Sequence, residues 1–159
     1  MPMPKSVTKV TKDGVRYTSN VEKTQYTIHE LSRGALRDVA KLLRKRIKAA
    51  VPVDTGTLKK NVGTWVRKDK GTGESRLQVG VYDRTRAKKK GYKYAFYAMF
   101  HEFGTSKMRA ANGGRGFLKS TVLDNLDEIR KIQGQYLSAV ADENKARGLI
   151  NEDEEIADD

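Results

Sequence analysis

The spacing of apolar residues along the chain predicts a long amphipathic helix before any other element. From Ala35 to Ala50 apolar residues recur every three or four positions, and the opposite face is basic. This period is that of one helical stripe. Thr27 and Glu30 have the spacing of a capping box, and Pro52 disfavours helix at the residue before it. We therefore expect the helix over about residues 29–50.

The period then changes from helical to alternating. Apolar and polar positions alternate over residues 62–67 and again over 77–82, and residues 68–75 between them are rich in turn formers. This pattern predicts an antiparallel β-hairpin with a long tip. Trp65 lies in the first strand and is the single tryptophan. We expect it to pack against the body rather than to hold a ligand.

Helical spacing returns in the last third of the chain. Residues 94–103 predict a short helix ended by Gly104, although the aromatic run also fits a buried strand. Residues 106–116 are expected to form a loop. A long helix follows, and its stripe is longer than one small core requires, so its end is expected to pack on another subunit. The stripe comprises Leu118, Val122, Leu126, Ile129, Tyr136, Leu137 and Val140.

The two ends differ from the middle. Residues 7–12 and 15–18 flank Asp13-Gly14, which indicates either a hairpin or an arm that orders against a neighbour. From Asn151 onward the chain is nearly all acidic and is expected to be disordered. The predicted organisation is an arm or strand extension at 1–27, a single α+β domain at 28–147 and an acidic disordered tail at 148–159. The sequence contains no internal repeat.

Composition limits the protein to one modest core and reveals an uneven charge. The chain has 159 residues, of which 37% are hydrophobic, and a net charge of +12. Residues 1–120 carry 28 Lys and Arg against 9 Asp and Glu, whereas residues 121–159 carry 4 against 11. A basic body with an acidic end favours contact with nucleic acid or an acidic protein surface, or it serves solubility alone.

Two classes of protein are excluded by what the composition lacks. The chain has no cysteine, so it has neither disulfides nor cysteine-rich zinc sites. No apolar run approaches the roughly 20 residues that span a bilayer, and the amino terminus lacks the apolar stretch of a secretory signal. We therefore expect a soluble protein that is not exported and makes no membrane contact.

The segment 83–93 concentrates positive charge. Its six cations repel one another, so the segment is expected to stay open unless an acidic partner neutralises it. It fits a non-specific contact with DNA phosphates, a protein-docking loop, or a basic loop without a partner. The candidate partner or DNA contacts are Arg84, Arg86, Lys88, Lys89, Lys90, Lys107, Arg109 and Arg115.

Three motifs suggest a catalytic or ligand-binding site, and each lacks other residues that such a site requires. Asp54-Thr55-Gly56 is the tripeptide of aspartic proteases, but there is no second copy and it follows a helix and Pro52, so Asp54 is better explained as a cap. His101-Glu102 lacks the second histidine of a zincin helix. The glycines at 113–116 lack the strand and the Gly-Lys-Ser/Thr of a phosphate loop. We expect no catalytic, metal or cofactor site, and no enzyme.

Two motifs, one from Pro52 to Leu58 and one from Glu102 to Thr105, are followed by Phe117-Leu118, and their order resembles that of one protein family. The order runs from an amphipathic helix through a turn and a hairpin to a second turn and a last helix. Together these features look like the neck and tail-completion proteins of tailed bacteriophages, typified by gene product ten of phage Hong Kong 97, over about residues 28–140. The family usually has prolines shortly after a methionine that corresponds to Met108. These prolines are absent here, and residues 109–120 are glycine-rich. The motif residues are Pro52, Asp54, Thr55, Gly56, Leu58, Tyr94, Glu102, Phe103, Gly104, Thr105, Phe117 and Leu118.

The resemblance implies a structural role rather than a chemical one. It implies an α+β subunit of a ring, hexameric by analogy, at the head–tail junction of a virion assembled in the host cytoplasm. The implied partners are further copies of the chain, head-side connector or stopper proteins, and tail terminator or tail tube proteins, with passing DNA as a possible contact. A tail terminator and a basic nucleic-acid-binding accessory protein are the alternatives. The motif residues are implied to form corners of the subunit.

Overall fold

A single long helix organises the molecule. The computed structural model describes residues 4–10, 14, 16–52, 56–69, 71–105 and 116–155. Helix α1 (Val21–Ala50) has 30 residues and is therefore about 45 Å long. It begins well before the expected residue 29, because nothing from Val21 onward breaks the helix. Thr27 accordingly donates its hydroxyl to the Lys23 carbonyl within the helix (2.9 Å) and is not a cap.

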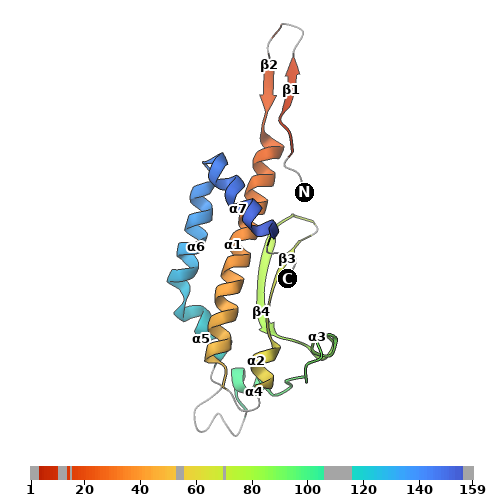
Figure 1. Cartoon of the computed structure of the whole chain (residues 1–159), viewed down its shortest axis with the longest axis vertical. Coiled ribbons are helices and arrows are strands. Elements are labelled where there is room, and N and C mark those ends of the chain that lie inside the picture. Colours follow the sequence, from red (N-terminus) through yellow and green to blue (C-terminus); the bar gives the residue numbers. More distant parts are fainter. Residues whose placement is uncertain are drawn as a thin grey trace.

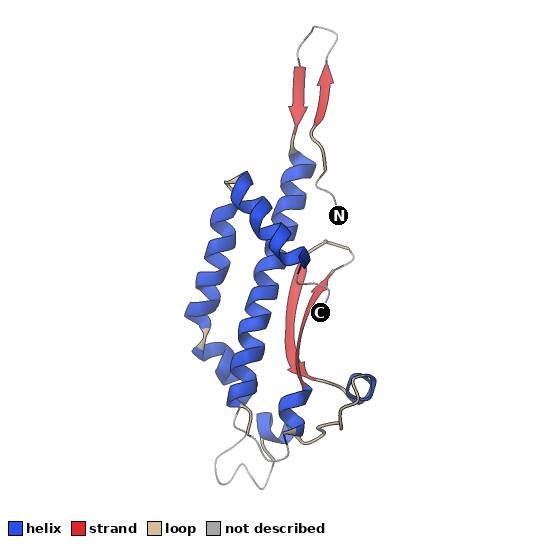
Figure 2. Ribbon diagram, viewed as in Figure 1, coloured by secondary structure: helices blue, strands red, loops and turns tan. Residues whose placement is uncertain are grey.

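The remaining elements form layers on the two sides of α1 (Figure 1, Figure 2). The hairpin of β3 (Val62–Lys68) and β4 (Ser75–Val81) lies on one side, in the predicted antiparallel register from Val62 opposite Val81 to Lys68 opposite Ser75. Helices α5 (Phe117–Asp124) and α6 (Leu126–Ala139) lie on the other side. The short helices α2 (Thr57–Asn61), α3 (Arg84–Lys89) and α4 (Ala98–Phe103) gather at one end. The predicted α+β class is confirmed.

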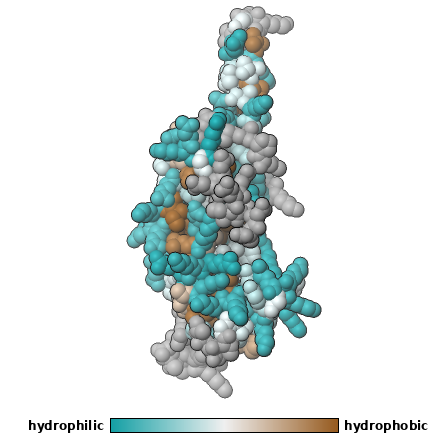
Figure 3. Space-filling view, in the orientation of Figure 1, coloured by the Kyte–Doolittle hydropathy of each residue, from teal (hydrophilic) through white to brown (hydrophobic). Residues whose placement is uncertain are grey.

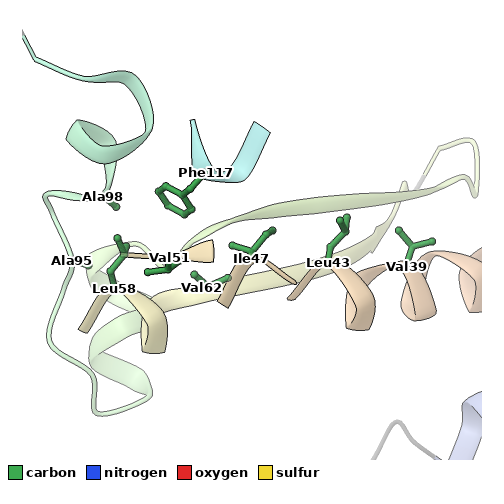
Figure 4. Packing of buried hydrophobic residues seen from close by; sticks show 9 residues of the cluster. All are labelled: Val39, Leu43, Ile47, Val51, Leu58, Val62, Ala95, Ala98 and Phe117. Atoms are coloured by element: carbon green, nitrogen blue, oxygen red, sulfur yellow. The ribbon is translucent and has the colours of Figure 1, made fainter. Parts of the chain in front are cut away.

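The core consists of two clusters along α1. The larger joins α1, the hairpin and the three segments that meet at its end (Figure 4): Val39, Leu43, Ile47, Val51, Leu58, Val62, Ala95, Ala98 and Phe117. The smaller joins α1 to the carboxyl-terminal helices through Leu31, Ala35, Tyr136, Ala139 and Ala146. Ile47 and Val62 are fully buried, and each such side chain stabilises the fold by about 1.5–3 kcal/mol.

The carboxyl-terminal part differs from the sequence prediction in two ways. The expected continuous helix is broken at Asn125, whose side chain donates to the Thr121 carbonyl (2.7 Å) while its backbone leaves the helical region. A further helix, α7 (Glu143–Glu155), then follows and buries Ala146 against the second cluster. The prediction of disorder is therefore wrong for residues 148–155, and residues 156–159 lie outside the described chain.

The amino-terminal segment forms a hairpin that stands apart from the body. Strands β1 (Val7–Val10) and β2 (Arg16–Ser19) pair antiparallel, with Val7 opposite Ser19 and Lys9 opposite Tyr17. This hairpin, called the arm below, extends beyond the start of α1 (Figure 1). The predicted hairpin is confirmed, and whether it orders against a neighbour stays a prediction.

Candidate functional site

The first motif turns the chain from α1 into the hairpin. The Val51 amide donates to the Ile47 carbonyl (2.9 Å) and ends α1 with extended backbone before Pro52. Gly56 has φ +70°, a left-handed conformation that suits glycine, and its carbonyl accepts from Lys60. Leu58 is buried in the core. Asp54 and Thr55 lie outside the described residues, so the capping role of Asp54 stays a prediction.

Glu102 holds the second motif together by capping a helix distant in sequence. Its carboxylate accepts from the backbone amides of Leu118 (2.9 Å) and Lys119 (3.2 Å), and its carbonyl accepts from Gly116 (3.1 Å). Gly116 precedes α5 and has no side chain to cap it. A carboxylate at a helix amino terminus satisfies free amides and complements the helix dipole. Glu102, which belongs to α4, therefore supplies the side-chain cap of α5 that Gly116 cannot provide.

The other residues of this motif divide between interior and surface. Gly104 has φ +80° and ψ 177°, a conformation almost restricted to glycine, and its amide ends α4 on the Phe100 carbonyl. Thr105 and Leu118 are half-buried, and Phe117 is buried in the core. Phe103, between the two structural residues, is 77% exposed. The corner is thus held by Glu102 and Gly104 and presents Phe103 to solvent.

Phe103 belongs to an exposed apolar surface on α4. We call Phe96, Met99, Phe100 and Phe103 the α4 apolar patch; Met99, for example, is 64% exposed. Ala95, before the helix, and Ala98, at its start, are buried, whereas Tyr94 and Met99 are exposed. Clustered exposed apolar side chains are typical of protein–protein contacts.

The basic segment 83–93 is a docked helix, not an open loop. Asp83 caps it by accepting from the Arg86 amide (2.7 Å), and Ala87 is fully buried. The Arg86 guanidinium lies 4.8 Å from the centre of the Trp65 ring, and the Lys90 ammonium lies 5.6 Å from that of Tyr82. These cation–π contacts use one face of α3. The prediction of an open segment was wrong because it ignored the aromatic surface beneath.

That aromatic surface depends on a glycine in β3. Trp65 and Tyr82 meet edge to face with ring centres 5.7 Å apart, and Tyr92 lies 6.5 Å from Tyr82. A Cβ added at Gly63 would lie 2.6 Å from the Tyr82 ring, so only glycine leaves room for it. Trp65 is a packing residue, as predicted. The aromatic cluster of Trp65, Tyr82 and Tyr92 is thus the surface over which the side chains of Arg86 and Lys90 lie.

Asn61 ties both ends of the basic segment to α2. Its buried side-chain NH2 group donates to the carbonyls of Thr57 and Lys93 (both 2.8 Å). Its backbone carbonyl accepts from the Tyr82 amide (2.8 Å). A polar cleft of about 320 Å³ lies beside it, lined by Thr57, Lys60, Asn61, Gly91, Tyr92 and Lys93. No sequence pattern distinguished Asn61, because its partners are backbone atoms brought in by the fold.

Positive charge is found on α3 and on the end of α1. Arg84, Lys88, Lys89 and Lys90 are exposed on and just after α3. On α1, partial burial together with the charges of Arg44 and Lys59 lowers the pKa of Lys48. Among the described residues, none of these cations has an ion pair. Lys107, Arg109 and Arg115 lie outside the described chain, so their place beside α3 is untested.

The described part of the chain has neither a metal-binding nor a membrane-spanning feature. In residues 4–155, gaps excepted, no three His, Asp or Glu side chains come together as metal ligands. Over the same residues, no helix combines the length and apolarity needed to cross a bilayer.

The chain is a small α+β protein whose described motif residues shape its corners and which leaves apolar side chains exposed on α4. A family described as "Bacteriophage HK97-gp10, putative tail-component" matches residues 15–104. The chain belongs to this family of phage tail components. The match begins in the arm and ends at Gly104, so it does not reach Phe117 and Leu118. No curated protein and no solved structure matches the chain.

Proposed function

We propose that the protein is a non-enzymatic virion subunit that forms a ring at the head–tail junction of a tailed phage and completes the neck or tail. Its family of tail components supports a structural role. The α4 apolar patch carries the proposal, because it stays exposed beside a corner that Glu102 and Gly104 hold in place. A rigid apolar surface of this kind is suited to a permanent protein contact.

A ring also requires two unlike surfaces on each subunit, since each copy contacts its neighbours head to tail. The α4 apolar patch lies at the α2–α4 end of the molecule, and the arm lies at the opposite end (Figure 1). Separate surfaces of this kind support heterologous assembly. The proposed partners are other copies of the chain, in a hexamer by family analogy, head-side connector or stopper proteins, and tail terminator or tube proteins.

A null mutant of the phage or inducible prophage that encodes the chain tests this role. We expect filled heads and tails that fail to join, seen by electron microscopy, and recovery of infectious particles when the gene is supplied in trans. Tails of irregular length would instead favour the tail terminator, because a terminator stops growth of the tube. Normal yields of infectious phage from the null mutant would contradict both.

Contact with DNA is a second candidate, favoured by the lysines on the outer face of α3. Arg84, Lys88 and Lys89 are exposed, whereas Arg86 lies over the Trp65 ring, so these three side chains are accessible to phosphates. Such binding has no base preference and weakens steeply with salt. It would let a subunit beside the passing genome hold it loosely.

A salt titration of binding to duplex DNA tests the second candidate. We expect measurable affinity at low ionic strength, a steep fall towards physiological salt, and marked loss in Lys88→Glu/Lys89→Glu. Lys131→Glu, an exposed lysine on α6, is the matched control and should lose far less. Absence of binding at low salt, or equal loss in the control, would remove this function.

A further inference from the structure

The arm has little within its own subunit to hold it. Both strands are exposed almost throughout, and Tyr17 is 59% exposed. Val7, Lys9, Tyr17 and Ser19 share one face of the hairpin, as their pairing requires. A two-stranded hairpin alone is only marginally stable in water. An additional contact is therefore needed to keep the arm ordered.

An apolar groove lies between α1 and α6, near the base of the arm. It has a volume of about 340 Å³ and is lined by Ile28, Leu31 and Leu36 of α1 and by Tyr136, Leu137 and Val140 at the end of α6. Leu137 is 74% exposed and lies near the end of the apolar stripe, which the sequence predicts to pack on another subunit. Apolar surface is visible between α6 and α1 and again on the arm (Figure 3). We call this feature the α1–α6 groove.

The arm and the groove match in size. The groove follows α1 from Ile28 to Leu36, which is about 12 Å at the helical rise. Each strand of the arm has four residues and spans about 10 Å. Val7 and Tyr17 would place their side chains against the apolar residues that line the groove. Burial of such surface is worth about 25 cal/mol per Å².

The arm and the carboxyl-terminal part of the chain carry opposite net charge. Residues 1–20 carry four Lys and Arg against one Asp, a net +3. Residues 132–159 carry two Lys and Arg against eight Asp and Glu, a net −6, and six of these acids stand at positions 152–159, after the residues that line the groove. Opposite charges steer the encounter and set its orientation. The basic α3 end of the molecule offers the arm no such attraction.

The arm does not lie in its own groove. Only Asn20 separates β2 from α1, and the arm continues past the start of α1, away from the groove (Figure 1). We infer that the arm of one copy lies in the α1–α6 groove of a second copy. This inference rests on the proposed self-assembly and names one of its contacts. It also accounts for the exposed end of the α6 stripe.

The absence of cysteine makes a directed cross-linking experiment clean. Single-cysteine variants Tyr17→Cys, on the arm, and Leu137→Cys, in the groove, are mixed and treated with a short bifunctional maleimide. Because each chain carries one cysteine, every product joins two copies. We expect the mixed pair to cross-link several-fold more than Tyr17→Cys mixed with Leu123→Cys. Leu123 is an exposed leucine on α5 outside the groove and serves as the matched control.

Each other outcome overturns the inference. Cross-linking of Tyr17→Cys with itself above the mixed pair would mean that arms pair with arms. A yield equal to the Leu123→Cys control, or no product at all, would mean that the groove does not receive the arm. Neither result bears on the proposed function, which the null mutant decides independently.

A second readout does not depend on cysteines. Leu137→Glu places a charge in the groove. Because the Leu137 side chain is mostly exposed, the variant is expected to fold. We expect its solution mass by light scattering to fall towards the monomer, as with deletion of residues 1–19, while Leu123→Glu keeps the wild-type mass. Wild-type mass in both Leu137→Glu and the arm deletion would also overturn the inference.

Discussion

Glu102 joins two helices through a single side chain. Its carboxylate accepts from two amides at the start of α5, where Gly116 offers no cap of its own. The cost of losing a cap is about 1 kcal/mol. At the scale of single residues, Glu102 therefore joins the end of α4 to the start of α5.

The Glu102 cap leads to the first prediction. Glu102→Ala should lower the free energy of unfolding by about 1 kcal/mol, and Glu102→Gln by less, because an amide oxygen still accepts. Denaturant titration followed by circular dichroism measures the change. Glu74→Ala, an exposed glutamate at the tip of the β3–β4 hairpin, is the control and should stay within a few tenths. Equal losses in both variants would contradict the capping role.

Asp38 leads to a prediction about pH. Burial raises its pKa, but hydrogen bonds from Lys41 and Tyr136 outweigh burial and leave the pKa below its ordinary value. The Tyr136 hydroxyl donates to Asp38 at 2.6 Å. A lowered pKa in the folded state means that ionised Asp38 stabilises the fold fully above its unfolded pKa of about 3.9. That stability is lost as the pH falls through the lower folded value.

Removing the hydroxyl should therefore matter at neutral pH and less in acid. Tyr136→Phe is expected to lower the melting temperature clearly at neutral pH, and by a smaller amount at an acid pH below the lowered pKa of Asp38, where its carboxyl group is protonated. Thermal melts at both pH values measure the difference. Tyr94→Phe changes an exposed hydroxyl and is the control. A deficit of equal size at both pH values would show that Asp38 does not act through this bond.

At the scale of elements, α3 shows how a strongly basic segment becomes ordered. Repulsion among its cations is offset by the Asp83 cap, by burial of Ala87 and by the placement of Arg86 over Trp65. Asn61 fixes the segment at both ends. The helix is thus held by the hairpin and α2 rather than by its own propensity.

Asn61 leads to the prediction at this scale. Asn61→Ala leaves the Thr57 and Lys93 carbonyls without their donor and should cost about 1–3 kcal/mol. Hydrogen exchange should rise most at the Lys93 end of the basic segment, which the side chain anchors. The Tyr82 end should change less, because its amide bonds to the Asn61 backbone carbonyl, which the substitution keeps. Asn144→Ala, on the exposed surface of α7, should leave that exchange unchanged. A uniform rise across the whole chain would argue against a local anchoring role.

At the scale of the whole molecule, apolar surface remains uncovered at both ends. The core clusters bury the middle of α1, while the α4 apolar patch and the arm stay exposed. Deleting exposed side chains costs little folding energy, so their loss should affect assembly alone. This separation makes the patch testable within the virion.

The last prediction concerns that patch. Phe103→Ser/Met99→Ser should fold with wild-type stability and fail to restore infectious particles to the null mutant. The physical reason is that the apolar contact area of the patch is lost. Leu123→Ser, which alters exposed apolar surface on α5, should complement normally. Plaque counts and thermal melts measure the two properties. Normal complementation by the double variant would exclude the patch as an essential contact.

Elements that depend on residues close along the chain could be predicted from the sequence, whereas features that depend on distant contacts could not. The β3–β4 hairpin, the stripe of α1 and the helix end at Gly104 arise from local periodicity and backbone preference, and all three were predicted. The start of α1 at Val21 was missed because a plausible cap at Thr27 competed with continued helix. The break at Asn125 was missed because hydrophobic spacing alone continues through it.

The amino-acid sequence by itself determined the apolar stripe of α1, the β3–β4 hairpin, the basic body and acidic end, and the resemblance to the family, because these depend on composition and on residues close along the chain. The tertiary structure alone decided what the motif residues do. Glu102 became a cap only when α5 was brought to it, and Arg86 a packing residue only when α3 met Trp65. The exposed surfaces likewise emerged only from packing, since periodicity predicts an apolar face but not whether the same chain covers it.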